Sequence, residues 1–303
     1  AVYGLTVFFG GWETILWYNK TAYRGDLTST FINRNSYATY AAIGLVASIL
    51  YLVKILARDL RGGGSTRQII RNMADGTLAR AWLPLVGILS TGTALMLTHS
   101  RAGFTSGMIG VFVALLGLRF AKTLPVRFGN GLIAGAVLLA VGGFAISGGG
   151  LEERFGYLDS SQRNRMHLYD QVLTAASQAS ATGYGYGTFE PGFRLFKDLR
   201  LSGLTWNLAH NSYLEFYFGT GLYGLVIIIC AFVCIFFGLV KGAFLRVHDT
   251  TYLITGVSAL TIVGLHALTD FSIQMPAMGA ALVFVAGLGY ARIIVDTKGR
   301  SRP

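Results

Sequence analysis

Residues Leu214–Val240 read LEFYFGTGLYGLVIIICAFVCIFFGLV, a run in which Glu215 is the only charged side chain. A helix crosses the hydrocarbon core of a bilayer in roughly 20 residues, so this run is long enough to span a membrane. His210 and Asn211 stand just before it, where polar sequence gives way to apolar sequence. The run therefore predicts a transmembrane helix with polar groups at its N-terminal end.

The rest of the chain has the same character. Of its 303 residues, 53% are hydrophobic and 13% are charged, and that charged share is about half of what a soluble domain carries. Further apolar runs of helical length occur at Tyr37–Ala57, Ala81–Thr98, Phe104–Leu118, Gly131–Ile146, Tyr252–Leu268 and Ala277–Val295. We therefore expect an all-α polytopic membrane protein with about seven transmembrane helices, forming a single transmembrane domain over residues 1–303. The opening segment looks like the end of another membrane segment, so we also expect helices N-terminal to this chain.

The charges indicate an orientation. Alternating the seven runs across the bilayer puts 15 Lys and Arg with 4 Asp and Glu on one side, which accounts for the whole net charge of +11. Basic residues gather on the cytoplasmic side of membrane proteins, so we assign that side to the cytoplasm. The excess charge thus indicates topology and contact with anionic membrane lipids. Nothing in the sequence resembles a nucleic-acid-binding motif.

Two connections on the opposite side are long, Asn19–Ser36 and Ser147–Ala209. We expect residues 147–209 to form a partly helical periplasmic loop, inserted between transmembrane helices, that covers the bundle. Apolar residues recur at nearly helical spacing from Met166 to Leu173, which predicts a helix there. The later GYGYG predicts a turn, and it is no dinucleotide-binding loop because no strand precedes it.

Arginine is unusually frequent on this outer side, against the usual topological bias. Its planar fork can grip phosphate through two hydrogen bonds and stays charged, which favours a diphosphate site. Ordinary surface pairing with acidic neighbours is the alternative. Arg101 differs, because LTHSRAGF leaves almost no loop between two spans, and a guanidinium near hydrocarbon needs an anionic ligand or lipid headgroups as its partner. The outer arginines are Arg24, Arg34, Arg101, Arg154, Arg163, Arg165, Arg194 and Arg200.

The residues before the Leu214–Val240 run could carry chemistry. Ser212 and Glu215 fit a capping box, which predicts a helix beginning near Asn211 or Ser212. His210 would then lie beside unpaired amides that form a ready anion site. A neutral histidine there could take a proton from a sugar hydroxyl, or it could serve only as a hydrogen-bonded cap. Three glycines deeper in the run would let a neighbouring helix or lipid chain approach closely; they are Gly219, Gly221 and Gly224.

Three further residues are weaker candidates. His99 could line a site beside Arg101 or be a buried packing residue. His266 and Asp270 could pair across one helical turn, and we expect a structural role for them. The outer segments contain no Asp-X-Asp pair and no His/Cys cluster, so the sequence gives little support for metal catalysis.

Together these motifs resemble the bacterial O-antigen ligase family, within a wider superfamily of ligases and polymerases. HN followed after nine residues by GLYG, from His210 to Gly224, is similar to the signature of that family. Similar stretches in the family's order are GDLTSTFINRNSYAT, THSRAG, RMHLYDQVLTAASQASATGYGYGTF and DFSIQMP. The resemblance therefore covers most of the chain.

The resemblance implies a glycosyltransferase of GT-C-like architecture in the bacterial inner membrane, with its active site facing the periplasm and no metal or other cofactor. Such an enzyme moves a glycan from undecaprenyl diphosphate to a hydroxyl of lipid A-core. The residues implied for catalysis are His210, Arg101 and Arg165, and those for substrate binding are Arg34, Arg163, Arg24, Asn211 and Tyr169. Tyr169 stands where the family often has tryptophan.

Two alternatives stay open. A polymerase for O antigen or exopolysaccharide would use the same donor with another lipid-linked glycan as acceptor. A flippase for a lipid-linked glycan would need polar residues along a path through the membrane, whereas the polar residues here gather at one face.

Overall fold

The computed structural model describes residues 1–60, 78–121, 130–131, 134–135, 138, 142, 151–202, 206–245 and 249–300. Its elements are α1 (Val2–Phe9), β1 (Thr14–Ile15), β2 (Tyr18–Asn19), α2 (Arg34–Leu60), α4 (Leu78–Leu97), α5 (Arg101–Phe120), α7 (Leu151–Gln178), α8 (Phe189–Phe193), α9 (Leu199–Ser202), α10 (Ser212–Leu245), α11 (Thr250–His266), the 3₁₀ turn η2 (Ser272–Gln274) and α12 (Pro276–Arg300). The strands β1 and β2 form one short antiparallel pair. The all-α prediction is confirmed for the part of the chain that the structure describes.

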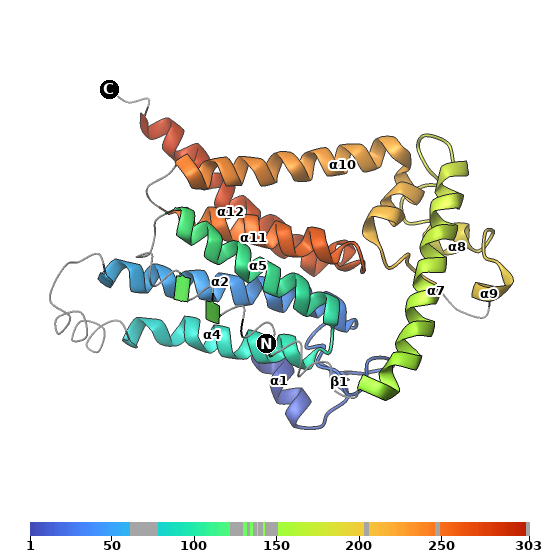
Figure 1. Ribbon diagram of the computed structural model, residues 1–303, viewed down its shortest axis with the longest axis horizontal. Helices are drawn as coiled ribbons and strands as arrows, with labels where there is room; N and C mark the ends of the chain where they lie inside the picture. Colours follow the sequence, from blue (N-terminus) through green and yellow to red (C-terminus); the bar gives the residue numbers. More distant parts are fainter. Residues whose placement is uncertain are drawn as a thin grey trace.

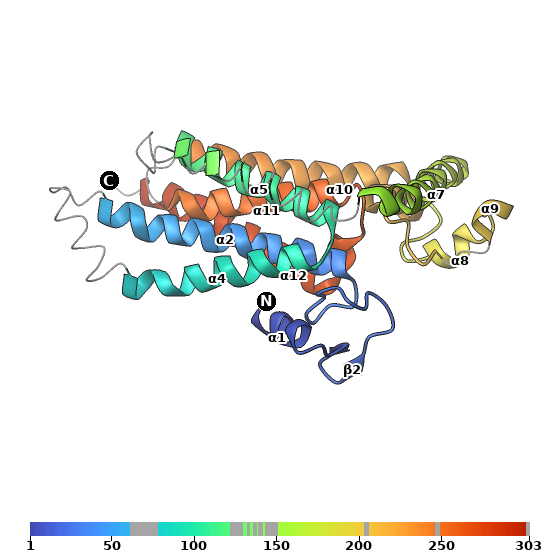
Figure 2. The same cartoon turned by 60° about the horizontal axis from the view of Figure 1, so that its bottom comes forward.

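Six long helices form the bundle: α2, α4, α5, α10, α11 and α12 run side by side (Figures 1 and 2). α11 lies in the middle and packs against α2, α5, α10 and α12. Small residues allow this close packing: a Cβ atom at Gly110 of α5 would overlap the side chain of Ile262 of α11. The outer helices leave many apolar side chains exposed; in α10, Ile227 and Phe237 are 68% and 62% exposed. Such an apolar exterior is what a lipid environment favours.

Five helices in the described residues are long and apolar enough to cross a membrane, at Arg34–Ala57, Arg80–Leu97, Arg101–Phe120, Ser212–Leu245 and Pro276–Ile293. Each coincides with a predicted run. The predicted run Tyr252–Leu268 corresponds to α11, a shorter apolar helix of 17 residues. The predicted run Gly131–Ile146 falls largely outside the described residues. Seven spans are therefore not confirmed.

The two ends of the bundle differ in chemistry. At one end, Asp249 accepts ion pairs from Lys54 (3.2 Å) and Arg292 (3.4 Å), and both cations lie over the ring of Tyr252. At the other end, the segment before α2 meets the end of α4, where the Leu27 amide donates to the Leu97 carbonyl. This second end carries the arginine-rich connections.

α7 crosses this second end of the bundle and packs against the first part of α10 (Figure 1). The predicted helix around Met166–Leu173 is thus confirmed, although its buried face is formed by Leu168 and Val172, while Met166 and Leu173 are largely exposed. The connection after α7 then runs along α10. Its Tyr184 and Gly185 amides donate to the carbonyls of Phe218 and Gly219.

Gly221 makes that contact possible. It interrupts α10 with φ 66° and ψ −174°, a conformation that is essentially restricted to glycine. A Cβ atom at Gly221 would overlap the carbonyl of Ala181. The close approach expected at these glycines is made, at Gly219 and Gly221, by the glycine-rich turn after α7. Gly224 instead faces Thr220 of its own helix.

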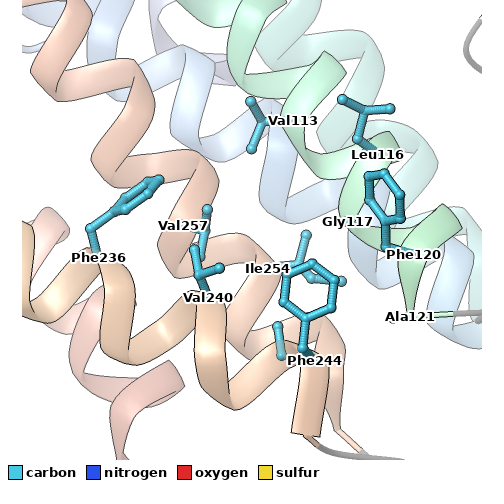
Figure 3. A pocket seen from close by; sticks show the side chains of 11 residues that line it. Val113, Leu116, Gly117, Phe120, Ala121, Phe236, Val240, Phe244, Ile254 and Val257 are labelled. Carbon is cyan, nitrogen blue, oxygen red and sulfur yellow. The ribbon is translucent and has the colours of Figure 1, made fainter.

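An apolar groove lies between the second halves of α5 and α10 and the first half of α11 (Figure 3). Its volume is about 310 Å³, and it is lined by Val113, Phe120, Phe236, Phe244, Ile254 and Val257 among others. These residues belong to the end of the bundle that carries Asp249. The groove is thus remote from the arginine-rich end.

Candidate active site

His210 occupies a constrained position immediately before the N-cap of α10. Its backbone has φ 52°, in the left-handed region that few non-glycine residues adopt. The Tyr169 hydroxyl of α7 donates a hydrogen bond to the His210 carbonyl at 2.7 Å. The imidazole lies between the rings of Trp206 and Phe271, with centroid separations of 5.7 and 5.1 Å. Packing from three segments thus holds this half-buried side chain.

Neither ring nitrogen of His210 has a hydrogen-bond partner among the described residues, and its Nδ1 atom is buried. Burial lowers the pKa of the imidazole, and the guanidinium of Arg165 lowers it further, while the carboxylate of Asp270 raises it in opposition. The net direction is downward, so His210 is neutral near pH 7. A neutral imidazole without a protein partner is free to accept a proton from a ligand.

Asn211 is the N-cap of α10. Its side-chain Oδ1 accepts from the amides of Tyr213 and Leu214, both at 3.1 Å. Glu215 does not form the predicted capping box with Ser212, because its carboxylate accepts from the Ala209 amide (2.9 Å) instead. The helix begins at Ser212, as predicted. A direct contact of Asn211 with substrate stays a prediction.

The predicted anion site at this helix start is wrong. The Ser212 amide donates to the carbonyl of Ala267, and the Glu215 amide donates to the carbonyl of Asn211. The two amides between them are already bound to the Asn211 side chain. All four first amides of α10 therefore have protein acceptors, and a phosphate would have to be bound by side chains.

Arg165 of α7 is the cation whose charge acts on the pKa of His210. Its guanidinium acts on the pKa values of His210, Tyr169 and Tyr23, so these groups share one region. Among the described residues, Arg165 has neither a hydrogen bond nor an ion pair. A half-buried guanidinium without a protein counter-ion is typical of a site for an anionic ligand.

Arg34 lies at the start of α2 and belongs to a second, linked cluster. It donates to Asp26 at 2.8 Å and lies over the ring of Tyr23 at 5.6 Å. Asp26 also pairs with Nδ1 of His99 at 2.7 Å. His99 is therefore part of a polar cluster and is not a buried packing residue. Tyr23 joins this cluster to the His210 region, because burial and Asp270 raise its pKa while Arg34 and Arg165 lower it.

Asp270 is the residue of this region whose role sequence reasoning missed. It is fully buried, its carboxylate accepts from Asn35 Nδ2 of α2 at 3.1 Å, and it also accepts from the hydroxyl of Ser272. His266 does not bond to it through its side chain but to the Thr39 hydroxyl, which replaces the predicted pair. The signal in the sequence is a carboxylate at the end of an apolar run, which is costly without a function or a partner.

A comparison with protein families identifies the central part of the chain. Residues 85–229 match a family model described as O-antigen ligase. The chain contains an O-antigen ligase family domain. This domain covers α4 to the first half of α10, including Arg101, Arg165, Tyr169 and His210, and the match leaves out Arg34 and Asp270.

A curated relative extends the similarity beyond the O-antigen ligase domain. The exopolysaccharide production protein ExoQ of Rhizobium meliloti (strain 1021) is 24% identical over 268 residues, which is 86% of this chain. The chain spans 58% of the length of that relative.

The remaining arginines of the predicted site are Arg101, Arg24 and Arg163. Arg101 is the first residue of α5, where Ser100 caps the helix by accepting from the Gly103 amide. α5 begins at the end of the bundle that α7 crosses (Figure 1). Arg101 has no hydrogen bond or ion pair among the described residues. Arg24 is exposed and donates to the Lys20 carbonyl. Arg163 is exposed on α7, two residues from Arg165 and so on a different face of the helix.

The O-antigen ligase domain thus brings together Arg165, Tyr169 and His210, with Arg34 linked through Tyr23. The described residues contain no group of three or more His, Cys, Asp or Glu side chains that could hold a metal ion. The side chain of Arg154 falls outside the described residues.

Proposed function

We propose that this protein is a membrane glycosyltransferase that moves a glycan from undecaprenyl diphosphate to a hydroxyl of lipid A-core on the periplasmic side, without a metal ion. The observation that carries this proposal is that a neutral imidazole, His210, lies in the electrostatic field of Arg165. The guanidinium of Arg165 has no counter-ion among the described residues. One group suits a hydroxyl nucleophile and the other suits a diphosphate. The O-antigen ligase domain supports the same reading.

His210 acts as the general base. As the acceptor oxygen attacks the anomeric carbon, its proton passes to a ring nitrogen of His210, the new glycosidic bond forms, and the bond from that carbon to the phosphate oxygen breaks. The electron pair of the broken bond leaves with undecaprenyl diphosphate. A single direct displacement of this kind inverts the anomeric carbon. A positioned base of this type contributes about 10²–10⁴-fold to the rate.

The arginines stabilise the leaving diphosphate, whose negative charge grows as the bond breaks. Arg34 has its charge offset by Asp26 at 2.8 Å, so it is the weaker candidate for gripping phosphate. Arg165 and Arg101 have no such offset among the described residues, and they are the better candidates. The role of Arg101 requires that the bound donor extends from Arg165 to the start of α5.

The membrane placement follows from charge. The bundle end with Lys54 and Arg292 faces the cytoplasm, and the His210 end faces the periplasm, because basic connections stay on the cytoplasmic side. We extend this to an inner-membrane enzyme of GT-C-like architecture in which residues 147–209 cover the donor head group. The lipid tail would lie against the apolar sides of the helices.

A second candidate is a polymerase that lengthens a lipid-linked glycan. The observation in its favour is the similarity to a relative named for exopolysaccharide production. Both reactions use the same donor and the same base, so the residues of the site do not distinguish the two acceptors.

Purified protein in liposomes tests the proposal. The liposomes would contain a polyprenyl diphosphate-linked glycan and, in separate samples, lipid A-core or no further acceptor. Labelled glycan on lipid A-core supports the ligase, and elongated lipid-linked glycan without that acceptor supports the polymerase. Movement of the glycan lipid between leaflets without any transfer would contradict both and favour a flippase.

Deletion of the gene separates the two enzymes in the cell. A ligase mutant should accumulate long lipid-linked polymer and leave the core bare, whereas a polymerase mutant should leave single repeats. Disappearance of the long lipid-linked chains would exclude the ligase.

A further inference from the structure

Asp270 joins the elements around His210 at a single buried point. Its carboxylate is held by Asn35 of α2 and by Ser272, while its backbone carbonyl accepts from the Ser212 hydroxyl at the start of α10 (2.9 Å). Its amide donates to the carbonyl of His266 at the end of α11. The residue thus connects three helix ends next to the imidazole.

The Asp270 carboxylate is fully buried, and among the described residues it has no ion pair with Lys, Arg or His. Asp26, by contrast, pairs with both Arg34 and His99. Burying a carboxylate without a cation is expensive, because the hydrogen bonds replace only part of its hydration. Such a cost is typical of a functional site, where the charge is needed for another state of the protein.

The charge of Asp270 acts on the groups of the candidate site. It raises the pKa of His210 against burial and against the Arg165 guanidinium, and it raises the pKa of Tyr23 and of Tyr169. The field at His210 therefore has one fixed cation on α7 and one fixed anion after α11.

Other ionisable groups lie in the same region: Tyr23, Tyr169, Glu215 and His266. The Glu215 carboxylate of α10 accepts from the Ala209 amide, and His266 of α11 bonds to the Thr39 hydroxyl. The Tyr169 hydroxyl donates to the His210 carbonyl. Among the carboxylates of this region, Asp270 is the one whose charge acts on the His210 imidazole.

The geometry points to Asp270 as a positioning residue for glycan transfer, whose buried carboxylate stabilises the imidazolium that forms when His210 takes the proton of the acceptor hydroxyl. The inference rests on the proposed function. It explains why an anion is placed in a region that would bind a diphosphate: the carboxylate is fully buried, and Asn35 and Ser272 hold it in place.

Asp270→Asn tests the inference, because asparagine keeps the shape and can still accept from Asn35 and donate to Ser272. In liposomes, the rate of transfer would be measured against pH. Removal of the anion lowers the pKa of His210, so the acidic limb of the rate profile should move to lower pH, and the maximal rate should fall roughly tenfold because His210 becomes a weaker base. The KM for the donor should not rise, since removing a negative charge does not weaken binding of a diphosphate.

Two variants serve as comparisons. Asp170→Asn makes the same change at an exposed carboxylate of α7 and should leave the profile unchanged. Ser272→Ala removes one hydrogen bond to Asp270 but keeps the charge, so it should lower thermal stability without moving the acidic limb. If Asp270→Asn and Ser272→Ala behave alike, with loss of folded protein and an unmoved limb, Asp270 is only structural and the inference is wrong.

A titration without turnover separates this inference from the proposed function. The imidazole signal of His210 would be assigned by NMR from its loss in His210→Ala, and then followed with pH in wild type and in Asp270→Asn. A fall in the pKa of His210 in Asp270→Asn supports the electrostatic link even if no glycan transfer is found, in which case the proposed function alone fails. An unchanged pKa in a protein that transfers glycan overturns the inference alone.

Discussion

The hydroxyl of Tyr169 on α7 donates a hydrogen bond of 2.7 Å to the backbone carbonyl of His210, 41 residues further along the chain. This bond ties the helix that carries Arg165 to the residue that carries the imidazole. Because His210 has a left-handed backbone, its orientation depends on such contacts. This tyrosine therefore helps to hold one candidate group in place relative to the other.

Tyr169→Phe should loosen that arrangement. Loss of a net hydrogen bond is worth about 1 kcal/mol, so we expect transfer to slow by roughly 5- to 10-fold with a small drop in thermal stability. Steady-state kinetics and thermal unfolding in detergent measure the two effects. Tyr186→Phe, at a residue that is 66% exposed, is the matched control and should change neither. Full activity in Tyr169→Phe would show that the bond does not position His210.

His210→Ala should lower the rate of transfer by about 10²–10⁴-fold while the protein still reaches the membrane. His167→Gln, on α7 and paired with Asp198, should retain transfer. In wild type the acidic limb of the rate profile should lie below pH 6.5, because burial and Arg165 both lower the pKa of His210 from that value. The base must be neutral, so the rate rises as pH increases through this pKa. A limb above pH 6.5, or an active His210→Ala variant, would rule out the assigned role.

Arg165→Lys keeps the positive charge but loses the planar fork. A charged hydrogen bond contributes about 1.5–3 kcal/mol, so we expect kcat/KM for the lipid diphosphate to fall by roughly 10- to 100-fold. Arg194→Lys is the matched control, because Arg194 is an exposed arginine paired with Glu190 one turn away on the surface. Equal kinetics for Arg165→Lys and wild type would argue against a two-bond grip on phosphate.

Gly221→Ala should destabilise the contact between α10 and the turn after α7. Its positive φ and the approach of the Ala181 carbonyl leave no room for a side chain, and we expect a loss of about 1–3 kcal/mol in stability. Gly287→Ala on α12 is the control, since a Cβ atom there meets nothing within 4 Å. Thermal unfolding of both variants in detergent measures the difference. Equal melting temperatures would mean that the turn does not rest on α10 as described.

Transfer should continue at its normal rate after treatment with EDTA in metal-depleted buffer, because the proposed mechanism neutralises the diphosphate with guanidinium groups. The rate in liposomes, with and without the chelator, is the measurement. Loss of activity that a divalent ion restores would overturn the metal-free mechanism.

Several features of the site depended on contacts that no local pattern contains. Ser212 and Glu215 satisfy the spacing of a capping box. The amides of Tyr213 and Leu214 donate to the Asn211 side chain instead, and the Glu215 carboxylate accepts from the Ala209 amide. Spacing shows which partners are within reach, whereas packing decides which of them is used. The predicted His266–Asp270 pair failed for the same reason, because α2 supplies Thr39 and Asn35 as competing partners.

The sequence by itself determined the long apolar helices, the helix in the loop before His210 and the grouping of arginines near one end. These features follow from the hydropathy and period of neighbouring residues, which is information carried within a few turns of chain. Five of the predicted runs coincide with helices able to cross a membrane for that reason. The number of spans is not confirmed, because α11 is a shorter apolar helix and the predicted run Gly131–Ile146 falls largely outside the described residues.

Only the tertiary structure decided which polar groups share the site. Asn35 and the Asp270 that it binds are separated by 235 residues, and Tyr23 comes under the fields of Arg34 and Arg165 only because the start of α2 and α7 lie at the same end of the bundle. The structure also distinguished the arginines, since Asp26 offsets Arg34 while Arg165 has no protein anion among the described residues. Electrostatic energy depends on distance and burial, and those are fixed only when helices far apart in the chain pack together.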